Sequence, residues 1–164
     1  MKILITGGRS AKAIKLMKAF SGWEIIMADY GDMPTLASAN YQLLSLGDIN
    51  EESIAHLLLT HCLDQQVDVL LPLHRFEIEP LIKADILFEE FNVSICAPDR
   101  NSYLDYLLPA QNPKKDWAIF NQGELVYCTM PNAALDQLGT ENRWNGAFEM
   151  ENLDGEWKLN LMLI

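Results

Sequence analysis

The first ten residues, Met1-Lys-Ile-Leu-Ile-Thr-Gly-Gly-Arg-Ser10, constrain the fold more than any other stretch of the chain. Residues 3–5 are consecutive apolar residues, which is typical of a parallel strand buried on both faces. Gly7 and Gly8 follow at once, and glycine allows a positive φ and a close approach of backbone to ligand. The N-terminal N–H groups of a following helix favour phosphate or carboxylate. This stretch therefore predicts a strand, a tight turn and a helix that together form an edge for a small anion.

Strand and helix patterns alternate through the first two thirds of the chain, which is typical of a parallel sheet with crossover helices. We expect strands at about 2–6, 23–28, 42–46, 67–71 and 93–97, with helices at about 10–20, 48–65, 77–91 and 99–107. The predicted fold class is α/β, with a Rossmann-like parallel sheet of about five strands flanked by helices. Apolar spacing predicts which side chains face the sheet: Ala13, Ile14, Met17 and Phe20 in the first helix, and Ile54, Leu57, Leu58 and Cys62 in the second.

Asp48 is the predicted N-cap of the second helix, since Glu51 three residues later would complete a capping box. Beyond residue 108 the pattern changes to short strands at about 118–120, 125–129, 147–151 and 157–164, with a hairpin signal at Asn152–Gly155. We therefore expect a Rossmann-like domain over residues 1–108 and a β-rich extension over 109–164. The final residues 159–164 are strongly apolar, so the domain, a partner subunit or further chain must cover them.

Composition narrows the class of protein. The chain has 164 residues, is 49% hydrophobic and carries a formal net charge of −11, so we expect no general nucleic-acid binding. Its apolar runs are too short to cross a membrane, and the start lacks the apolar stretch of a secretory signal, so we predict a cytoplasmic protein. Cys62, Cys96 and Cys128 are widely spaced, which predicts reduced, buried thiols rather than a zinc or redox site.

Basic residues recur every third position in the first helix, at Arg9, Lys12, Lys15 and Lys18. One interpretation is a solvated helix face. The other is that Arg9, the nearest of them to the glycines, adds positive charge to an anion site.

Right-handed crossovers bring the strand ends Thr6, Asp29, Leu71 and Ala97 to one edge of the sheet, where ligands bind. Asp29 lies 22 positions after Gly7, about where a dinucleotide-binding fold places the acid that binds a ribose hydroxyl. The full Gly-x-Gly-x-x-Gly fingerprint is absent, however. The alternative is that the glycines only form a tight strand-to-helix turn.

The segment Leu71-Pro-Leu-His-Arg-Phe-Glu77 places His74, Arg75 and Glu77 at the same edge. His74 can also be a structural or surface residue, and Glu77 can simply complement the positive end of its helix. No metal signature, Walker loop or Ser-His-Asp spacing occurs. The candidate ligand-binding residues are Gly7, Gly8, Arg9, Ser10, Asp29, His74, Arg75 and Glu77, and catalytic residues are not assigned.

Four pieces of the sequence together resemble the pre-ATP-grasp domain, the Rossmann-like N-terminal module of ATP-grasp enzymes such as biotin carboxylase and carbamoyl phosphate synthetase-like ligases. They are Ile3-Leu-Ile-Thr-Gly-Gly8, the strand ending at Asp29, Val67-Asp-Val-Leu-Leu-Pro72 with Glu77 after it, and Val93-Ser-Ile-Cys-Ala-Pro-Asp99 leading to Leu104-Asp105. The resemblance implies a module that positions an acceptor substrate, with Gly7, Gly8, Arg9, His74 and Glu77 on the acceptor side. ATP and magnesium would belong to a separate ATP-grasp domain.

The resemblance does not extend to an ATP-grasp domain, because only about 55 residues follow Pro109 and such a domain needs several times that length. Residues 146–151 and 154–158 are similar to the family's metal-binding hairpin, in which a glutamate lies on the first strand. The family's Glu-x-Asn-Pro-Arg ending is replaced by Asn160-Leu-Met-Leu-Ile164, so the second acidic ligand and the arginine are missing. The resemblance thus implies an incomplete carboxylate-amine or carboxylate-thiol ligase, which could use ATP and Mg²⁺ only with a partner or a complete ATP-grasp domain.

Three functions remain open. The first is a pre-ATP-grasp-like domain that binds a small anionic ligand, either a carboxylate or a phosphate. The second is an NAD(P)- or nucleotide-binding domain of the oxidoreductase type. The third is a non-catalytic interaction module that forms a homodimer through its apolar C-terminal segment. No cofactor is assigned from the sequence itself, and neither nucleic acid nor membrane is an expected partner.

Overall fold

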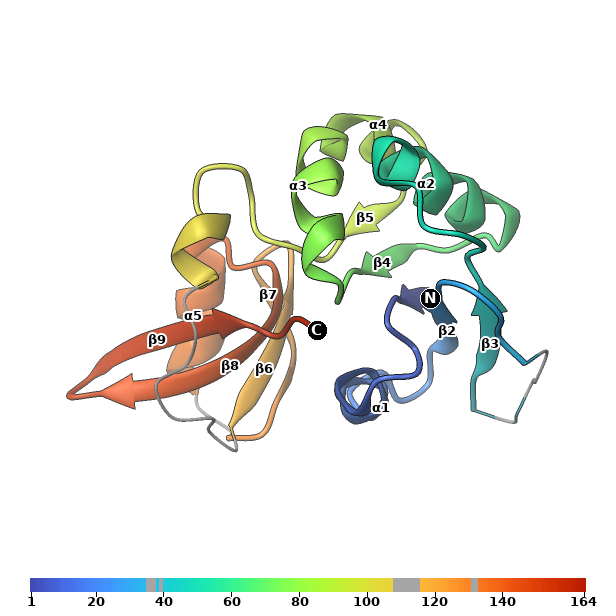
Figure 1. The fold of residues 1–164 in the computed structure, drawn as a ribbon. Helices are drawn as coiled ribbons and strands as arrows, with labels where there is room; N and C mark the ends of the chain where they lie inside the picture. The colour runs from blue at the N-terminus through green and yellow to red at the C-terminus, as the bar shows by residue number, and fades with distance from the viewer. Residues whose placement is uncertain (35–37, 39, 108–115, 131–132) are drawn as a thin grey trace. The chain divides into compact units, whose positions relative to one another are not determined.

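The computed structural model describes residues 1–34, 38, 40–107, 116–130 and 133–164 (Figure 1). Contacts divide the chain into two units, of which the first comprises Met1–Ile95 and Leu163–Ile164 and the second comprises Cys96–Met162. The boundary expected between residues 108 and 109 lies outside the described residues. The division by contacts falls earlier, directly after the last strand of the first unit.

The first unit contains a five-stranded parallel sheet. Its strands are β1 (Lys2–Ile5), β2 (Glu24–Asp29), β3 (Gln42–Ser45), β4 (Val69–Leu71) and β5 (Ser94–Ile95). They lie in the order β3-β2-β1-β4-β5, and every neighbouring pair is parallel. The predicted α/β class with a Rossmann-like sheet is therefore confirmed. The strand order reverses between β1 and β4, which makes the carboxyl edge of these two strands the topological switch point where such sheets hold ligands.

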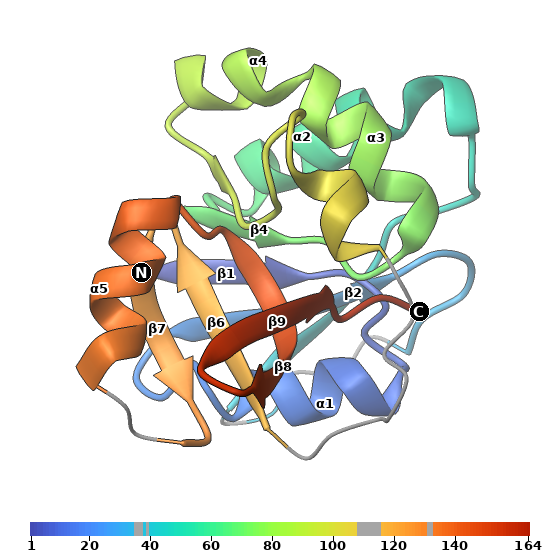
Figure 2. The same cartoon turned by 90° about the vertical axis from the view of Figure 1, so that its left-hand side faces the viewer.

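Helices cover both faces of this sheet. They are α1 (Ala11–Met17), α2 (Ile54–Asp64), α3 (Arg75–Lys83) and α4 (Asp85–Glu90). Figures 1 and 2 show α1 on one face and α2, α3 and α4 on the other. The single helix expected over residues 77–91 is two helices, because Ala84 adopts φ −100° and ψ 6° and ends α3.

The predicted buried faces are partly wrong. The first helix buries Ala13 and Leu16 and leaves Ile14 exposed. The helix ends at Met17 and has only about two turns, so fewer of its side chains contact the sheet than the apolar spacing predicted. Phe20, beyond the helix, is buried as expected. The second helix buries Ile54, Leu58, Leu59 and Cys62, whereas Leu57 is only half-buried.

The predicted cap at Asp48 is also wrong. A 3-10 helix, Glu51–Ser53, precedes α2, and the Asn50 side chain accepts the N–H of Glu52 at its start. The helical segment thus begins two residues later than predicted, and Asp48 lies before its cap. The first helix does begin where expected, since the Ser10 side chain caps it by accepting the N–H of Ala13 at 3.1 Å.

The second unit contains an antiparallel sheet. Its strands are β6 (Trp117–Asn121), β7 (Glu124–Cys128), β8 (Gly146–Leu153) and β9 (Glu156–Leu161), in the order β7-β6-β8-β9. The expected β-rich extension and its hairpin are confirmed. Asp154 and Gly155 both have positive φ, 52° and 96°, as a two-residue hairpin turn requires.

Two elements of this unit differ from expectation. Helix α5 (Ala133–Asn142) was not predicted, because its residues have no clear apolar period and it buries only Leu135 and Gly139. The helix expected over residues 99–107 is a 3-10 turn, Tyr103–Tyr106. The core of this unit combines aromatic side chains, among them Phe120 and Phe148, with aliphatic ones such as Leu135.

Three sequence expectations concern buried groups and membranes. Cys62 and Cys96 are free and buried, as predicted, whereas Cys128 is partly exposed. Leu159 and Met162 of the apolar C-terminal segment are buried by the chain itself, and the homodimer stays a prediction. None of the helices described here is long and apolar enough to cross a membrane.

Candidate functional site

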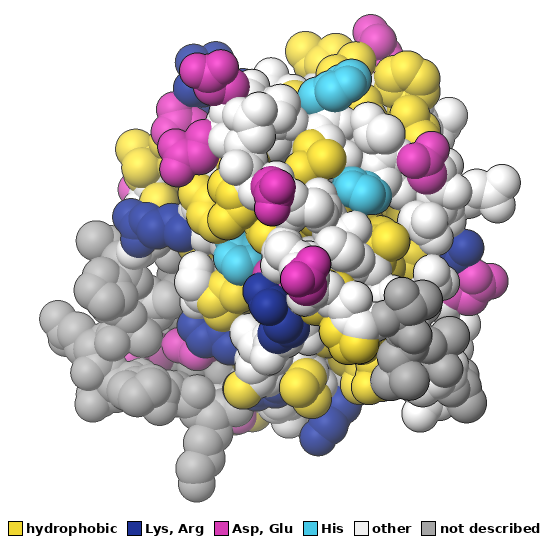
Figure 3. Space-filling view, turned by 45° about the vertical axis from the view of Figure 1, so that its right-hand side comes forward, with side chains coloured by type: hydrophobic (Ala, Val, Ile, Leu, Met, Phe, Trp, Pro, Cys, Tyr) yellow, Lys and Arg dark blue, Asp and Glu magenta, His cyan; other side chains and the backbone are white. Residues whose placement is uncertain are grey.

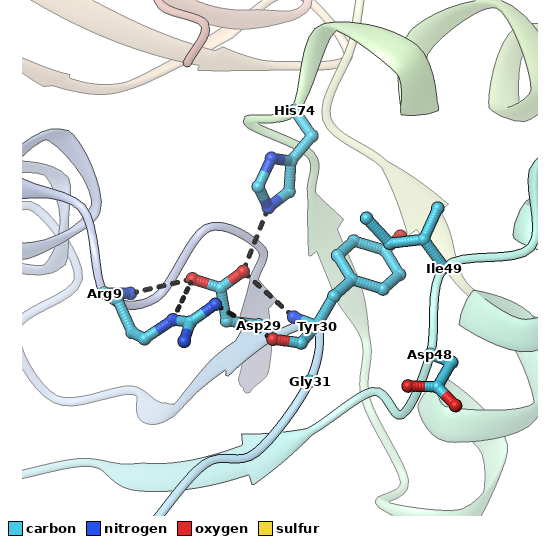
Figure 4. A pocket seen from close by; sticks show the side chains of 7 residues that line it. All are labelled: Arg9, Asp29, Tyr30, Gly31, Asp48, Ile49 and His74. Atoms are coloured by element: carbon cyan, nitrogen blue, oxygen red, sulfur yellow. Dashed lines mark hydrogen bonds and ion pairs between the residues drawn. The ribbon is translucent and has the colours of Figure 1, made fainter.

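A pocket of about 520 Å³ opens at the carboxyl edge of the parallel sheet. Its walls come from the segments that follow β1, β2, β3 and β4, and the lining residues are Arg9, Asp29, Tyr30, Gly31, Asp48, Ile49 and His74 (Figure 4). The space-filling view shows a face on which acidic, basic, histidine and hydrophobic side chains are interspersed (Figure 3). Such a mixed lining fits a small polar molecule with an apolar part better than a bare anion.

Asp29, the last residue of β2, is the centre of this pocket and is only 5% exposed. Its Oδ2 accepts the backbone N–H and the Nε–H of Arg9, each at 3.2 Å. Its Oδ1 accepts the Tyr30 N–H at 2.9 Å and lies 3.1 Å from His74 Nε2. Burial raises the pKa of Asp29, but these hydrogen bonds outweigh it and hold the pKa below its ordinary value of 3.8. The carboxylate is therefore ionised at neutral pH.

Arg9 and His74 approach different oxygens of the carboxylate, Arg9 at Oδ2 and His74 at Oδ1 (Figure 4). The Arg9 side chain is 59% exposed and also donates from Nη2 to the Tyr30 carbonyl at 2.9 Å. The His74 ring is more enclosed, because it stacks on Phe76 with ring centroids 4.9 Å apart and meets the edge of Tyr30 at 5.4 Å. Arg9 is thus the group that can leave Asp29 most easily.

Glu77 lies behind the pocket rather than on its wall, and it is 0% exposed. Its Oε2 accepts from Thr6 Oγ1 at 2.6 Å and from the His74 N–H at 3.2 Å. Its Oε1 accepts from the Tyr30 hydroxyl at 2.7 Å. Burial raises the pKa of Glu77, and the hydrogen bonds offset this only in part. Glu77 was a candidate ligand-binding residue; its carboxylate is fully buried, does not line this pocket and holds the residues around it.

The glycine turn differs from an open anion cradle. The N–H of Gly8 donates to the Ala28 carbonyl at 2.8 Å, that of Arg9 to Asp29, and that of Ser10 to the Gly7 carbonyl at 2.8 Å. A Cβ on Gly8 would lie 2.8 Å from the Met27 carbonyl carbon, so this glycine is required by packing against β2. The second interpretation of the glycines, a tight turn, therefore accounts for their hydrogen bonds.

The pocket brings together three of the eight candidate residues, namely Arg9, Asp29 and His74. Gly7, Gly8, Ser10 and Arg75 belong to neighbouring segments but do not line it. Sequence reasoning missed Tyr30, Gly31, Asp48 and Ile49. The sequence did carry a signal for Asp48 and Ile49. They follow the third strand, and ligands bind at the carboxyl ends of parallel strands, as argued for Asp29 at the end of the second strand.

In the described part of the chain, no cluster of three or more His, Cys, Asp or Glu side chains is placed to hold a metal ion.

No family model matches the sequence, and no curated protein matches it either. Among solved structures, the fold is similar to dTDP-glucose 4,6-dehydratase from Bacillus anthracis in complex with NAD, with a TM-score of 0.37 and 14% sequence identity. That match covers 85% of this chain and 47% of the dehydratase chain, so this chain spans less than half of that protein.

Proposed function

We propose that the first unit is a binding domain for the nucleoside part of a nucleotide, with Asp29 as the acceptor for ribose hydroxyls. The observation that carries the proposal is the place of this carboxylate, which ends β2 and lines a pocket at the carboxyl edge of the sheet. An acid at this place is what dinucleotide-binding folds use to bind a ribose hydroxyl. Its low pKa keeps it an acceptor at neutral pH.

Binding would require one exchange of hydrogen bonds. A carboxylate offers about four acceptor positions, and Asp29 uses four within the chain. The exposed Arg9 Nε–H is the donor that a ribose hydroxyl would replace. The displaced guanidinium would then face the ligand, where it suits a phosphate or a ring of the base.

The rest of the lining suits a base. Ile49 is exposed at the pocket and offers an apolar surface to a planar ring. Gly31 leaves open space on its side, since a Cβ there would meet nothing within 4 Å. The carboxylate of Asp48 can accept from an exocyclic amino group. These three residues favour a nucleoside over a simple carboxylate or phosphate.

The test is calorimetric titration of the chain with adenosine, AMP and NAD, for the parent protein and two variants. Asp29→Asn removes one acceptor and the charge, and we expect it to weaken adenosine binding at least tenfold. Glu24→Gln is the matched control, because Glu24 is the first residue of the same strand and lies at its amino end, away from the pocket. We expect it to change affinity less than twofold. Absence of binding by all three compounds would exclude the proposal.

The resemblance to the pre-ATP-grasp module stays a second proposal, and one observation in the second unit favours it. Asn160 on β9 is buried, and among the described residues its Oδ1 has no hydrogen-bond partner. Glu149 on β8 is its cross-strand neighbour. An unpaired acceptor beside a carboxylate suits a cation, and Asn160 would here take the place of the second acidic ligand that the sequence lacks.

Thermal unfolding with and without Mg²⁺ tests this second proposal. We expect Mg²⁺ to raise the melting temperature of the parent chain and to leave that of Asn160→Leu unchanged. If Mg²⁺ has no effect on the parent chain, the hairpin is not a metal site.

A further inference from the structure

Residues Leu163 and Ile164 lie within the first unit, at the carboxyl edge of the parallel sheet. The N–H of Ile164 donates to the Leu73 carbonyl at 2.8 Å, and the N–H of Arg75 donates to the Ile164 carbonyl at 3.4 Å. Ile164 is therefore held through both its N–H and its carbonyl by the backbone of the segment that follows β4. Lys12 on α1 donates from Nζ to the Leu163 carbonyl at 2.5 Å.

Gly7 makes room for this segment. A Cβ at Gly7 would lie 2.3 Å from Ile164 Cδ1 and 3.6 Å from Leu73 Cβ. The close approach that a glycine after β1 permits is thus used by the chain's own Ile164 side chain. Gly7 follows β1 and Leu73 follows β4, so Ile164 occupies the switch point between these two strands.

We propose that Leu163–Ile164 is an internal plug that sets the ligand specificity of the neighbouring pocket. The proposal rests on the proposed nucleoside site at Asp29. In sheets of this kind a nucleotide that binds ribose at the end of β2 runs its diphosphate over the glycine turn after β1. Here Ile164 lies on Gly7, so a nucleoside fits without disturbing the plug, whereas a diphosphate must displace it.

The residues of the turn after β1 also disfavour a diphosphate while the plug is in place. In the fingerprint Gly-x-Gly-x-x-Gly/Ala, the second glycine lets the backbone approach the diphosphate. Counted from Gly8, that position is Ser10 and the last is Ala13. The Ser10 side chain is committed to capping α1. Displacement of the plug frees the Lys12 ammonium and the Arg75 N–H, two donors that suit a diphosphate oxygen.

The experiment compares adenosine with ADP in the parent chain, in Ile164→Ser and in a chain that ends at Met162. Ile86→Ser is the matched control, because it makes the same substitution at an isoleucine that is 73% exposed on α4. Hydrogen exchange of the peptide covering residues 71–76 reports release, since the Arg75 N–H loses its acceptor. We expect release in both plug variants, with at least tenfold tighter ADP binding and less than twofold change for adenosine.

The outcomes separate the two proposals. If adenosine binds and ADP affinity stays within twofold after release, the plug proposal is overturned and the nucleoside site stands. If neither compound binds to any variant, both proposals are overturned. If the Arg75 N–H already exchanges in the parent chain as fast as in the plug variants, Ile164 is not a plug.

Discussion

The Tyr30 hydroxyl donates a hydrogen bond of 2.7 Å to Glu77 Oε1 and so ties the end of β2 to the first turn of α3. The other oxygen of Glu77 holds Thr6, the residue that follows β1. Thr6 Oγ1 in turn accepts the Leu73 N–H, just beyond β4, at 2.7 Å. One buried carboxylate thus joins the ends of three neighbouring strands directly beneath the candidate site.

Glu77→Ala should destabilise the first unit strongly. The change leaves the Thr6 and Tyr30 hydroxyls and the His74 N–H without an acceptor, and each unpaired buried donor costs about 1–3 kcal/mol. We expect the free energy of unfolding in urea to fall by about 3 kcal/mol or more. Glu79→Ala is the control, because Glu79 is exposed on the same helix and its loss should cost about 0.5 kcal/mol or less.

The pH dependence of Glu77→Gln tests the buried charge. Burial raises the pKa of Glu77 above its ordinary value of 4.5, so the folded state binds this proton more tightly than the unfolded state. The parent chain should therefore lose stability relative to Glu77→Gln as the pH rises from 4.5 through the folded pKa. Urea titrations of both proteins between pH 4 and 8 measure this, and a constant difference would contradict the raised pKa.

Asp29→Asn should show the opposite dependence. The pKa of Asp29 is below 3.8 in the folded state, so its stabilising effect is complete above the unfolded value and is lost as the pH falls through the folded pKa. We expect a loss of about 2 kcal/mol at pH 7, because hydrogen bonds to a charged group are affected. The loss should shrink at strongly acidic pH. If the loss of unfolding free energy in Asp29→Asn is the same at every pH, its cause is packing and not the charge of Asp29.

Gly8→Ala should destabilise by clash rather than by backbone strain. The new Cβ would lie 2.8–3.1 Å from backbone atoms of Met27 and Ala28, which cannot move as a side chain end can. We expect a cost of about 1–3 kcal/mol. Gly22→Ala, with φ +83° and open space around it, measures strain alone and should cost about 1 kcal/mol. Equal losses in thermal unfolding would argue against a close turn at Gly8.

The three thiols should differ in reactivity. Burial raises the pKa of Cys62 and of Cys96 to about 12, so neither forms a reactive thiolate at neutral pH. Cys128 is partly exposed and should be the first to react with a disulfide reagent. We expect Cys128→Ser to remove the early reaction of the native protein, while the two remaining thiols react fully in denaturant. Persistence of the early phase in that variant would show that a buried thiol is accessible.

Local patterns predicted most of the architecture. Apolar runs located the five parallel strands, and the Asp-Gly signal at Asp154–Gly155 located the hairpin, because strand burial and turn geometry depend on residues adjacent in the chain. The weakly periodic helix Ala133–Asn142 was missed, since Gly139 is buried by packing against Phe120 and Gly123, which lie elsewhere in the chain. The exposed Ile14 shows the same limit, because apolar spacing does not say where a short helix ends.

The sequence by itself determined that Asp29, Arg9 and His74 would meet at one sheet edge, since parallel strands with right-handed crossovers all end there. Only the tertiary structure decided that Glu77 is buried behind that edge and that Ile164 lies on Gly7. Glu77 lies 71 positions after its partner Thr6, and Ile164 lies 157 positions after Gly7. Formation of these contacts depends on strand order and on the path of the last residues, which no local periodicity encodes.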